Sequence, residues 1–147
     1  MTGPDFNERL TEIAAQPNGG AAAAATLGHW LSADQPFVNG AELRKFAERA
    51  PLGLIVDSFR CDIPFGTGGR RGRVGIGPNR INPRTLALTV AGHCEFLQRT
   101  GGDSASSKTV VVANDTRVFS DINKLHTFMG KDWSLLGTSS RSLALLA

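Results

Sequence analysis

The chain has 147 residues, the size of one globular domain, which is long enough to bury a core but short for a multi-domain enzyme. Hydrophobic residues make up 41% of it and charged residues 20%, a balance that excludes wholesale disorder. The net charge of +3 is unevenly placed, because residues 60–99 hold seven arginines against two acids. This local excess indicates either an anion-binding surface or a solvated basic face.

The first part of the chain, residues 1–50, is predicted to be a helical arm. A short apolar stripe is broken at Pro17-Asn18-Gly19-Gly20, a helical pattern resumes through Trp30, and a further helix is predicted over 41–49. Trp30 is expected to dock the arm onto the rest of the protein. The acidic N-terminus does not fit a signal peptide, and the apolar run 21–31 is too short to cross a bilayer. We therefore expect a cytoplasmic protein without membrane contact.

The next stretch, residues 52–65, contains β-branched and aromatic residues and is predicted to be extended. It leads into FGTGGRRGRVGIGPNRIN, residues 65–82, which has six glycines and four arginines. Asn82-Pro83 predicts the start of a helix, with an Asn cap and Pro at the first helical position, and that helix is expected to end at Gly101-Gly102.

The last part of the chain begins with KTVVVA, residues 108–113, a continuous apolar run typical of a buried parallel strand. A final helix is predicted after GTSSRS, with Ser139 or Ser140 as its cap. The order of elements predicts an α/β fold, a three-layer α/β/α domain with a mixed sheet. No strand follows the final helix, so we expect an incomplete domain over 51–147 and a chain that is a fragment of a longer protein.

Cysteine and histidine give no sign of a metal site. Cys61 and Cys94 lack the spacing of a metal or redox motif, and the three histidines show no ligand pattern. Free thiols and a reducing compartment are therefore expected. His93 falls in the middle of the helix after Pro83 and is expected to pack rather than to react.

The glycine-rich loop is the strongest candidate for a site. Glycines let the backbone approach a ligand and aim several N–H groups at one oxyanion, and Arg70 and Arg71 would clamp the phosphate oxygens. The string alone fits neither the P-loop nor the dinucleotide fingerprint, so a structural turn is the alternative. Nucleic acid is disfavoured as a partner, because only Phe65 and Phe96 are aromatic within residues 60–99.

In its wider context, the loop resembles the first domain of the α-D-phosphohexomutases, the phosphoglucomutases and phosphomannomutases. The resemblance lies in the order of an FGTxGxRG-like string, an N-R-x-N helix start and a strand ending in D-x-R. It is carried by Phe65, Gly66, Thr67, Gly69, Arg71, Gly72, Asn79, Arg80, Asn82, Asp115 and Arg117. Arg70 departs from the pattern, where Leu is usual. The helical arm and Ser139-Ser140-Arg141 are most similar to the larger branch that includes phosphopentomutases.

The resemblance implies a sugar-phosphate mutase that works through a phosphoserine, Mg²⁺ and a bisphosphate intermediate, with glucose 1-phosphate or a related sugar phosphate as substrate. It implies phosphate or substrate contacts for Thr67, Gly68, Gly69, Arg71 and Arg117. Arg70 is a further candidate, whose charge either adds to the phosphate site or points to solvent. Ser140 and Arg141 are candidates because the start of a helix can bind phosphate. The resemblance also implies supporting roles near the site for Asn79, Arg80, Asn82 and Asp115.

The phosphoserine loop, the Asp-rich metal loop and the sugar-recognition loop of that family have no counterpart in these 147 residues. No catalytic residue or metal ligand is therefore assigned, and the chain by itself is expected to be inactive. A non-catalytic module that binds phosphosugars or other anions is the alternative function.

Overall fold

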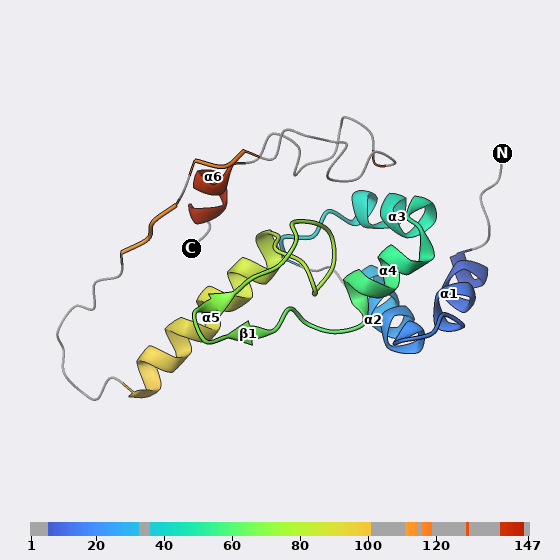
Figure 1. The fold of residues 1–147 in the computed structure, drawn as a ribbon, viewed down its shortest axis with the longest axis horizontal. Helices are drawn as coiled ribbons and strands as arrows, with labels where there is room; N and C mark the ends of the chain where they lie inside the picture. The colour runs from blue at the N-terminus through green and yellow to red at the C-terminus, as the bar shows by residue number, and fades with distance from the viewer. Residues whose placement is uncertain are drawn as a thin grey trace.

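The computed structural model of the chain describes residues 6–32, 36–100, 111–114, 116–118, 129 and 139–145. Figure 1 shows the first four helices gathered in one group, with the long helix α5 extending away from them. The elements are α1 (Phe6–Ala14), α2 (Gly20–Ser32), α3 (Gly40–Arg49), α4 (Leu52–Phe59), β1 (Phe65–Gly66), β2 (Gly69–Arg70), α5 (Pro83–Thr100) and α6 (Ser140–Ala144).

The predicted helical arm is confirmed, and α1 to α4 share one apolar core. Ile13, Leu27, Phe46 and Phe59 are all completely buried. Trp30 is 8% exposed and meets the ring of Phe59 edge to face, with 5.5 Å between ring centroids. The arm therefore docks through Trp30, as its position in the sequence predicts, and the docking partner lies on α4.

Polar contacts fix the ends of the arm helices. The predicted break between α1 and α2 is confirmed, with positive φ angles of 60° at Asn18 and 106° at Gly19. Asn39 caps α3, its side chain accepting hydrogen bonds from two backbone N–H groups of the first turn. Arg9 reaches from α1 to the other end of α3, donating to the carbonyls of Ala47 and Ala50 at 3.2 and 2.7 Å.

The extended structure predicted for residues 52–65 is wrong over its first half, because Leu52–Phe59 forms α4. Leu52, Ile55, Val56 and Phe59 recur at helical spacing, and the last three are buried in the core that α4 shares with α1 to α3. The β-branched residues suggested a strand, but tertiary burial of this helical face outweighs that weak preference.

Helix α5 begins as predicted at Asn82-Pro83. Only Thr85 of its residues is buried among the described parts of the chain, and both Leu88 and Phe96 are more than half exposed. His93 is exposed, so the expectation that it packs is wrong. The predicted end at Gly101-Gly102 lies outside the described residues.

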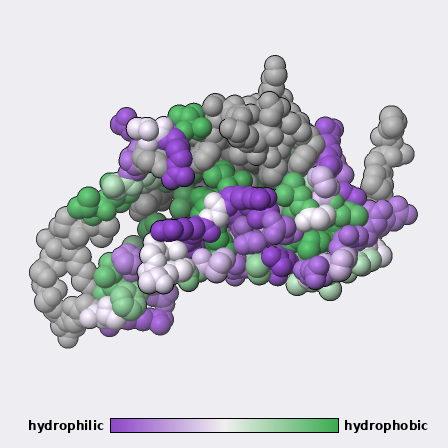
Figure 2. All heavy atoms as spheres, viewed as in Figure 1, coloured by the Kyte–Doolittle hydropathy of each residue, from purple (hydrophilic) through white to green (hydrophobic). Residues whose placement is uncertain are grey.

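On the face drawn in Figure 2, hydrophilic side chains cover much of the described surface, with apolar patches between them.

The strand predicted over 108–113 is not borne out in its described part. Residues 111–114 have no regular structure, and Val111 is 88% exposed. The described sheet is a two-stranded antiparallel ribbon, with Phe65 opposite Arg70 and Gly66 opposite Gly69. Met129 is 1% exposed and joins the hydrophobic core formed with α1 to α4.

The final helix, α6, is confirmed, and Ser139 caps it by accepting a hydrogen bond from the N–H of Ser142 at 3.1 Å. Taken together, the described residues are mostly helical with one small antiparallel ribbon, an incomplete α/β/α domain preceded by a helical arm. The division into an arm over 1–50 and a partial domain over 51–147 stays a prediction.

Candidate phosphate-binding site

The FGTGGRRG string folds into the β1–β2 hairpin. Thr67 and Gly68 form its exposed tip, and Gly69 has a φ of 110°, a conformation that disfavours any side chain. Arg70 ends β2 half-buried, and Arg71 follows it exposed. The glycines thus permit a tight reversal that presents two adjacent arginines directly after the turn.

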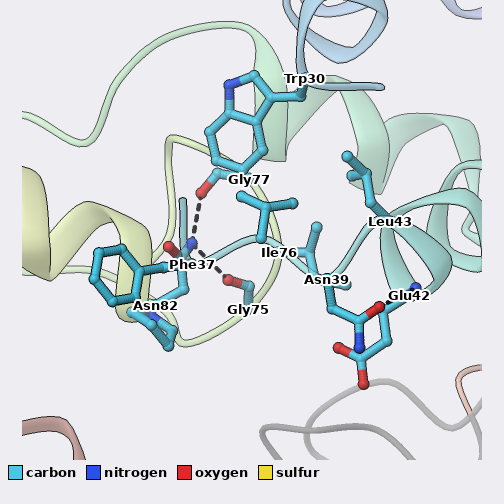
Figure 3. Close-up of a pocket in the computed structure, with 11 residues that line it drawn as sticks. Trp30, Phe37, Asn39, Glu42, Leu43, Gly75, Ile76, Gly77 and Asn82 are labelled. Carbon is cyan, nitrogen blue, oxygen red and sulfur yellow. Dashed lines mark hydrogen bonds between the residues drawn. The ribbon is translucent and has the colours of Figure 1, made fainter. Parts of the chain in front are cut away.

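After the hairpin, residues 73–82 form a closed loop around the side chain of Asn82. Its amide nitrogen donates to the carbonyls of Gly75 and Gly77 at 2.9 and 2.8 Å (Figure 3). Its amide oxygen accepts from the N–H of Thr85 at 3.0 Å, and the Thr85 hydroxyl accepts from the N–H of Asn82 at 3.0 Å. Asn82 therefore caps α5 and closes the loop with the same buried side chain.

The loop is also attached to α4. The Asn79 side chain donates to the carbonyl of Asp57 at 2.8 Å, and its backbone N–H donates to the carbonyl of Ser58 at 3.1 Å. Gly77, with a φ of 115°, lies so close that an added Cβ would meet the Ser58 oxygen at 2.5 Å. Only glycine fits this approach of two backbone segments.

Arg80 is buried in this junction rather than presented to a ligand. It is 4% exposed, and its Nη2 donates to Oδ2 of Asp57 at 2.5 Å. That hydrogen bond, aided by the charges of Arg80, Arg60 and Arg73, lowers the pKa of Asp57 although partial burial of the carboxyl opposes the shift. Arg80 is thus a structural cation that ties the loop to α4.

Four of the candidate phosphate-binding residues line one cleft of about 760 Å³: Arg70, Arg71, Arg117 and Ser140. The cleft lies between the hairpin, the first turns of α5, residues 112–114 with Arg117, and α6. Ser140 is held there because its N–H and its hydroxyl both donate to the carbonyl of Arg117, at 2.9 and 3.0 Å. The fold therefore brings together residues that lie up to 70 positions apart in the sequence.

The cleft combines positive charge with apolar walls. Its described lining contains three arginines and no acid, while Val74, Leu86 and Val90 supply apolar surface. An apolar wall lowers the local dielectric, so each arginine attracts an anion more strongly than it would in open water. A volume of this size is within the range of small-ligand sites. The arrangement suits an anionic ligand with an uncharged body.

The remaining predicted site residues lie elsewhere. Thr67, Gly68 and Gly69 are at or beside the hairpin tip and do not line the cleft, and Arg141 is exposed on α6 outside its lining. Asp115 lies outside the described residues. Asn79, Arg80 and Asn82 shape the loop behind the hairpin through the contacts given above.

Sequence reasoning missed two kinds of residue. Asp57 was not singled out, since nothing in its local sequence pairs it with an arginine 23 positions later. The apolar walls were also missed, although Leu86 and Val90 stand four residues apart on α5 and that spacing places them on one helical face.

A second recess, of about 60 Å³, lies between the arm and the 73–82 loop (Figure 3). Trp30, Leu43 and Ile76 give it apolar walls, and Glu42 is the single charged residue in its described lining. It is too small for a sugar phosphate and its charge has the wrong sign for one. Phosphate binding is therefore assigned to the arginine cleft.

The arginine cleft does not fit Mg²⁺. That ion takes oxygen ligands, chiefly carboxylates and water, whereas the described lining offers three guanidinium groups and no carboxylate. No group of three or more His, Cys, Asp or Glu side chains suited to a metal occurs within the described ranges. In the same part of the chain, no helix combines the length and apolarity needed to cross a membrane.

One comparison with known proteins identifies the segment that builds the hairpin, loop and α5. Residues 62–130 match the family model of the phosphoglucomutase/phosphomannomutase α/β/α domain I. No curated protein and no solved structure matches the chain. Because the matched segment contains the hairpin and the loop whose geometry is described above, the match supports an N-terminal α/β/α domain I of the phosphohexomutase family in this part of the chain.

Proposed function

We propose that this chain is the phosphate-binding first part of a sugar-phosphate mutase, an enzyme that moves a phosphoryl group within a hexose or pentose phosphate. The single observation that carries the proposal is the convergence of Arg70, Arg71, Arg117 and Ser140 on one cleft. The family match over 62–130 supports the same reading.

In this proposal the chain binds and orients a phosphate rather than attacking it. Arg71 and Arg117 hold the phosphate oxygens, since a guanidinium fork matches their geometry. Leu86 and Val90 exclude water from one side of the ligand. Phosphoryl transfer depends mainly on alignment and charge neutralisation, and positioned arginines supply both.

The donor phosphoserine and any metal ligands would come from residues other than these 147, and no step proposed for this chain passes through a metal. We place the chain in the larger branch of the family, on the helical arm before the loop and on Ser139-Ser140-Arg141. A cytoplasmic location is also proposed, because the exposed thiols of Cys61 and Cys94 are both free.

Calorimetric titration with glucose 1-phosphate, inorganic phosphate and glucose tests the proposal. Wild-type protein is expected to bind glucose 1-phosphate at millimolar concentration or below, and to bind glucose far more weakly. Arg71→Ala should weaken glucose 1-phosphate about tenfold or more, as expected for a lost charged hydrogen bond. Arg44→Ala, which removes an exposed arginine on α3, is the matched control and should bind as the wild type does.

The alternative function is a phosphosugar-binding module without turnover, and the same cleft favours it, because binding needs no nucleophile. An assay of the native polypeptide for conversion of glucose 1-phosphate to glucose 6-phosphate distinguishes the mutase from the binding module. Conversion supports the mutase. Binding without conversion, by a native polypeptide of the same mass as this chain, supports the module.

A further inference from the structure

We propose that Arg84 is a positioning residue for the arginine cleft. By stacking on Trp30 it fixes the first turns of α5 against α2, and with them the apolar wall that α5 gives to the cleft. The inference rests on the proposed function, because it concerns ligand affinity at the same cleft.

The first argument is the contact itself. The guanidinium carbon of Arg84, in the first turn of α5, lies 5.0 Å from the centre of the Trp30 ring on α2. The Nε of Arg84 is buried and has no hydrogen-bond partner within the described ranges, so at this atom no hydrogen bond substitutes for the ring contact. Indole is the best aromatic partner for a cation, and Trp30 is itself fixed against Phe59 in the core. Arg84 is therefore held on a well-packed part of α2.

The second argument is the side of the helix from which Arg84 acts. An α-helix turns by about 100° per residue, so Leu86 and Val90 lie about 200° and 240° around α5 from Arg84. Those two side chains line the cleft, whereas Arg84 is outside its lining. Arg84 thus braces α5 from the side largely opposite to the cleft. A shift of this contact would move the wall that meets the ligand.

The third argument is how little else, in the described part of the chain, sets the direction of α5. Thr85 is its one buried residue there, and Leu88 and Phe96 are more than half exposed. Asn82 and Thr85 form the cap, but its hydrogen bonds fix the position of that end rather than the tilt of the whole helix. The stack of Arg84 on Trp30 is therefore the side-chain contact suited to set the tilt of α5 relative to α2.

Calorimetric titration with glucose 1-phosphate on Arg84→Met tests the role, because this variant keeps an unbranched side chain and removes the guanidinium. We expect binding to weaken about threefold to tenfold, the scale of one cation–π contact. Arg84→Lys, which keeps a cation for the ring, should retain most of the affinity. Trp30→Leu should weaken binding by a factor similar to that of Arg84→Met, although it removes no charge.

A second readout separates positioning from a merely structural role. By linkage, a contact that tightens ligand binding is itself tightened by the ligand, so the fluorescence emission of Trp30 should change during the titration. Trp133→Phe leaves Trp30 as the sole tryptophan of the chain, and the change should follow the calorimetric dissociation constant. In Arg84→Met the change should disappear. A merely structural contact would lower the free energy of unfolding and leave the affinity and the emission response of the folded protein unchanged.

Arg99→Met is the matched control, because Arg99 lies near the other end of α5 with 76% of its side chain exposed. It removes the same net charge as Arg84→Met. An equal loss of affinity in the two variants would therefore attribute the effect to overall charge and overturn the proposal. Circular dichroism of each variant checks that it is folded.

The outcomes separate this inference from the proposed function. If wild-type protein binds glucose 1-phosphate but Arg84→Met binds it equally well, or if the emission of Trp30 does not respond, the role of Arg84 fails while the sugar-phosphate site stands. If wild-type protein does not bind glucose 1-phosphate at millimolar concentration, the proposed function fails and this inference fails with it.

Discussion

In the core formed by α1 to α4, the side chains that set the shape are apolar and fully buried, among them Phe46 and Phe59. In the loop from Arg73 to Asn82 the corresponding side chains are polar: Arg80 and Asn82 are buried, and each makes several directional hydrogen bonds. Burial of apolar surface has no preferred direction, whereas a hydrogen bond weakens steeply when its angle changes. The arm is therefore expected to tolerate apolar replacements of similar volume, and the loop to tolerate few replacements at all.

The difference bears on function because the loop directly follows the hairpin that presents two of the arginines of the cleft. Arg70 and Arg71 are placed by a hairpin that has little core of its own, followed by a loop whose contacts run to α4 and α5. The core of α1 to α4 thus supplies stability, and α4 gives the loop a fixed base. Three substitutions test this division of roles, from the largest expected effect to the smallest.

Phe59→Ala should have the largest effect on stability. Phe59 is completely buried and contacts the rings of Trp30 and Phe46. Its replacement by alanine leaves a cavity, which should lower the free energy of unfolding by about 3–5 kcal/mol. Urea unfolding followed by far-UV circular dichroism measures this. Phe37→Ala, at a side chain 58% exposed, is the control and should cost less than about 0.5 kcal/mol. Equal losses in the two variants would contradict an apolar core centred on Phe59.

Gly77→Ala should come next, and it tests the contact between loop and α4. The φ of 115° is strained for alanine by about 1–3 kcal/mol, and the new Cβ would also collide with the Ser58 carbonyl. The same urea titration measures the loss. At Gly68, by contrast, an added Cβ meets nothing within 4 Å, so Gly68→Ala should leave stability nearly unchanged. A loop that accepts alanine at Gly77 without loss is not packed against α4 as described.

Asp57→Asn should have the smallest effect, about 1–2 kcal/mol at neutral pH, because it leaves buried Arg80 without its charged partner while Asp57 itself is 44% exposed. The lowered pKa of Asp57 also gives a pH dependence. The stability that the pair contributes is present above the unfolded-state pKa of about 3.9, and it is lost as pH falls through the lower folded value.

Urea unfolding between pH 2 and pH 7 measures that dependence. Wild-type protein should lose more stability than Asp57→Asn as the pH falls below about 4. Asp62→Asn, at an exposed carboxyl, is the control and should behave as the wild type does. Identical acid profiles for wild type and Asp57→Asn would show that the pair with Arg80 contributes nothing.

The starts of helices α5 and α6 could be predicted from the sequence, because short-range hydrogen bonds determine them. Asn82-Pro83 marks the start of α5 and Ser139 caps α6, because each cap is made within three residues of its own helix. The identity of α4 was missed, since a short apolar run with β-branched residues is compatible with a strand or a helix until its packing partners are known.

For the site, the sequence order indicated which residues belong together but not how they are supported. The motif of glycines and arginines pointed to Arg71, and the family resemblance pointed to Arg117; both line one cleft. The burial of Arg80 depends on Asp57, a contact across 23 residues that no local pattern encodes. The buried Nε of Arg70, which has no hydrogen-bond partner within the described ranges, is likewise visible only in the folded structure.

The central claim, that the arginines after the hairpin and the start of α6 share one sugar-phosphate site, is tested most directly by amide chemical shifts during a titration with glucose 1-phosphate. The account predicts that Arg71, Gly72 and Ser140 shift together with one dissociation constant, while Leu43 in the arm does not. Shifts confined to the hairpin, or shifts of Ser140 with a separate constant, would contradict a shared cleft.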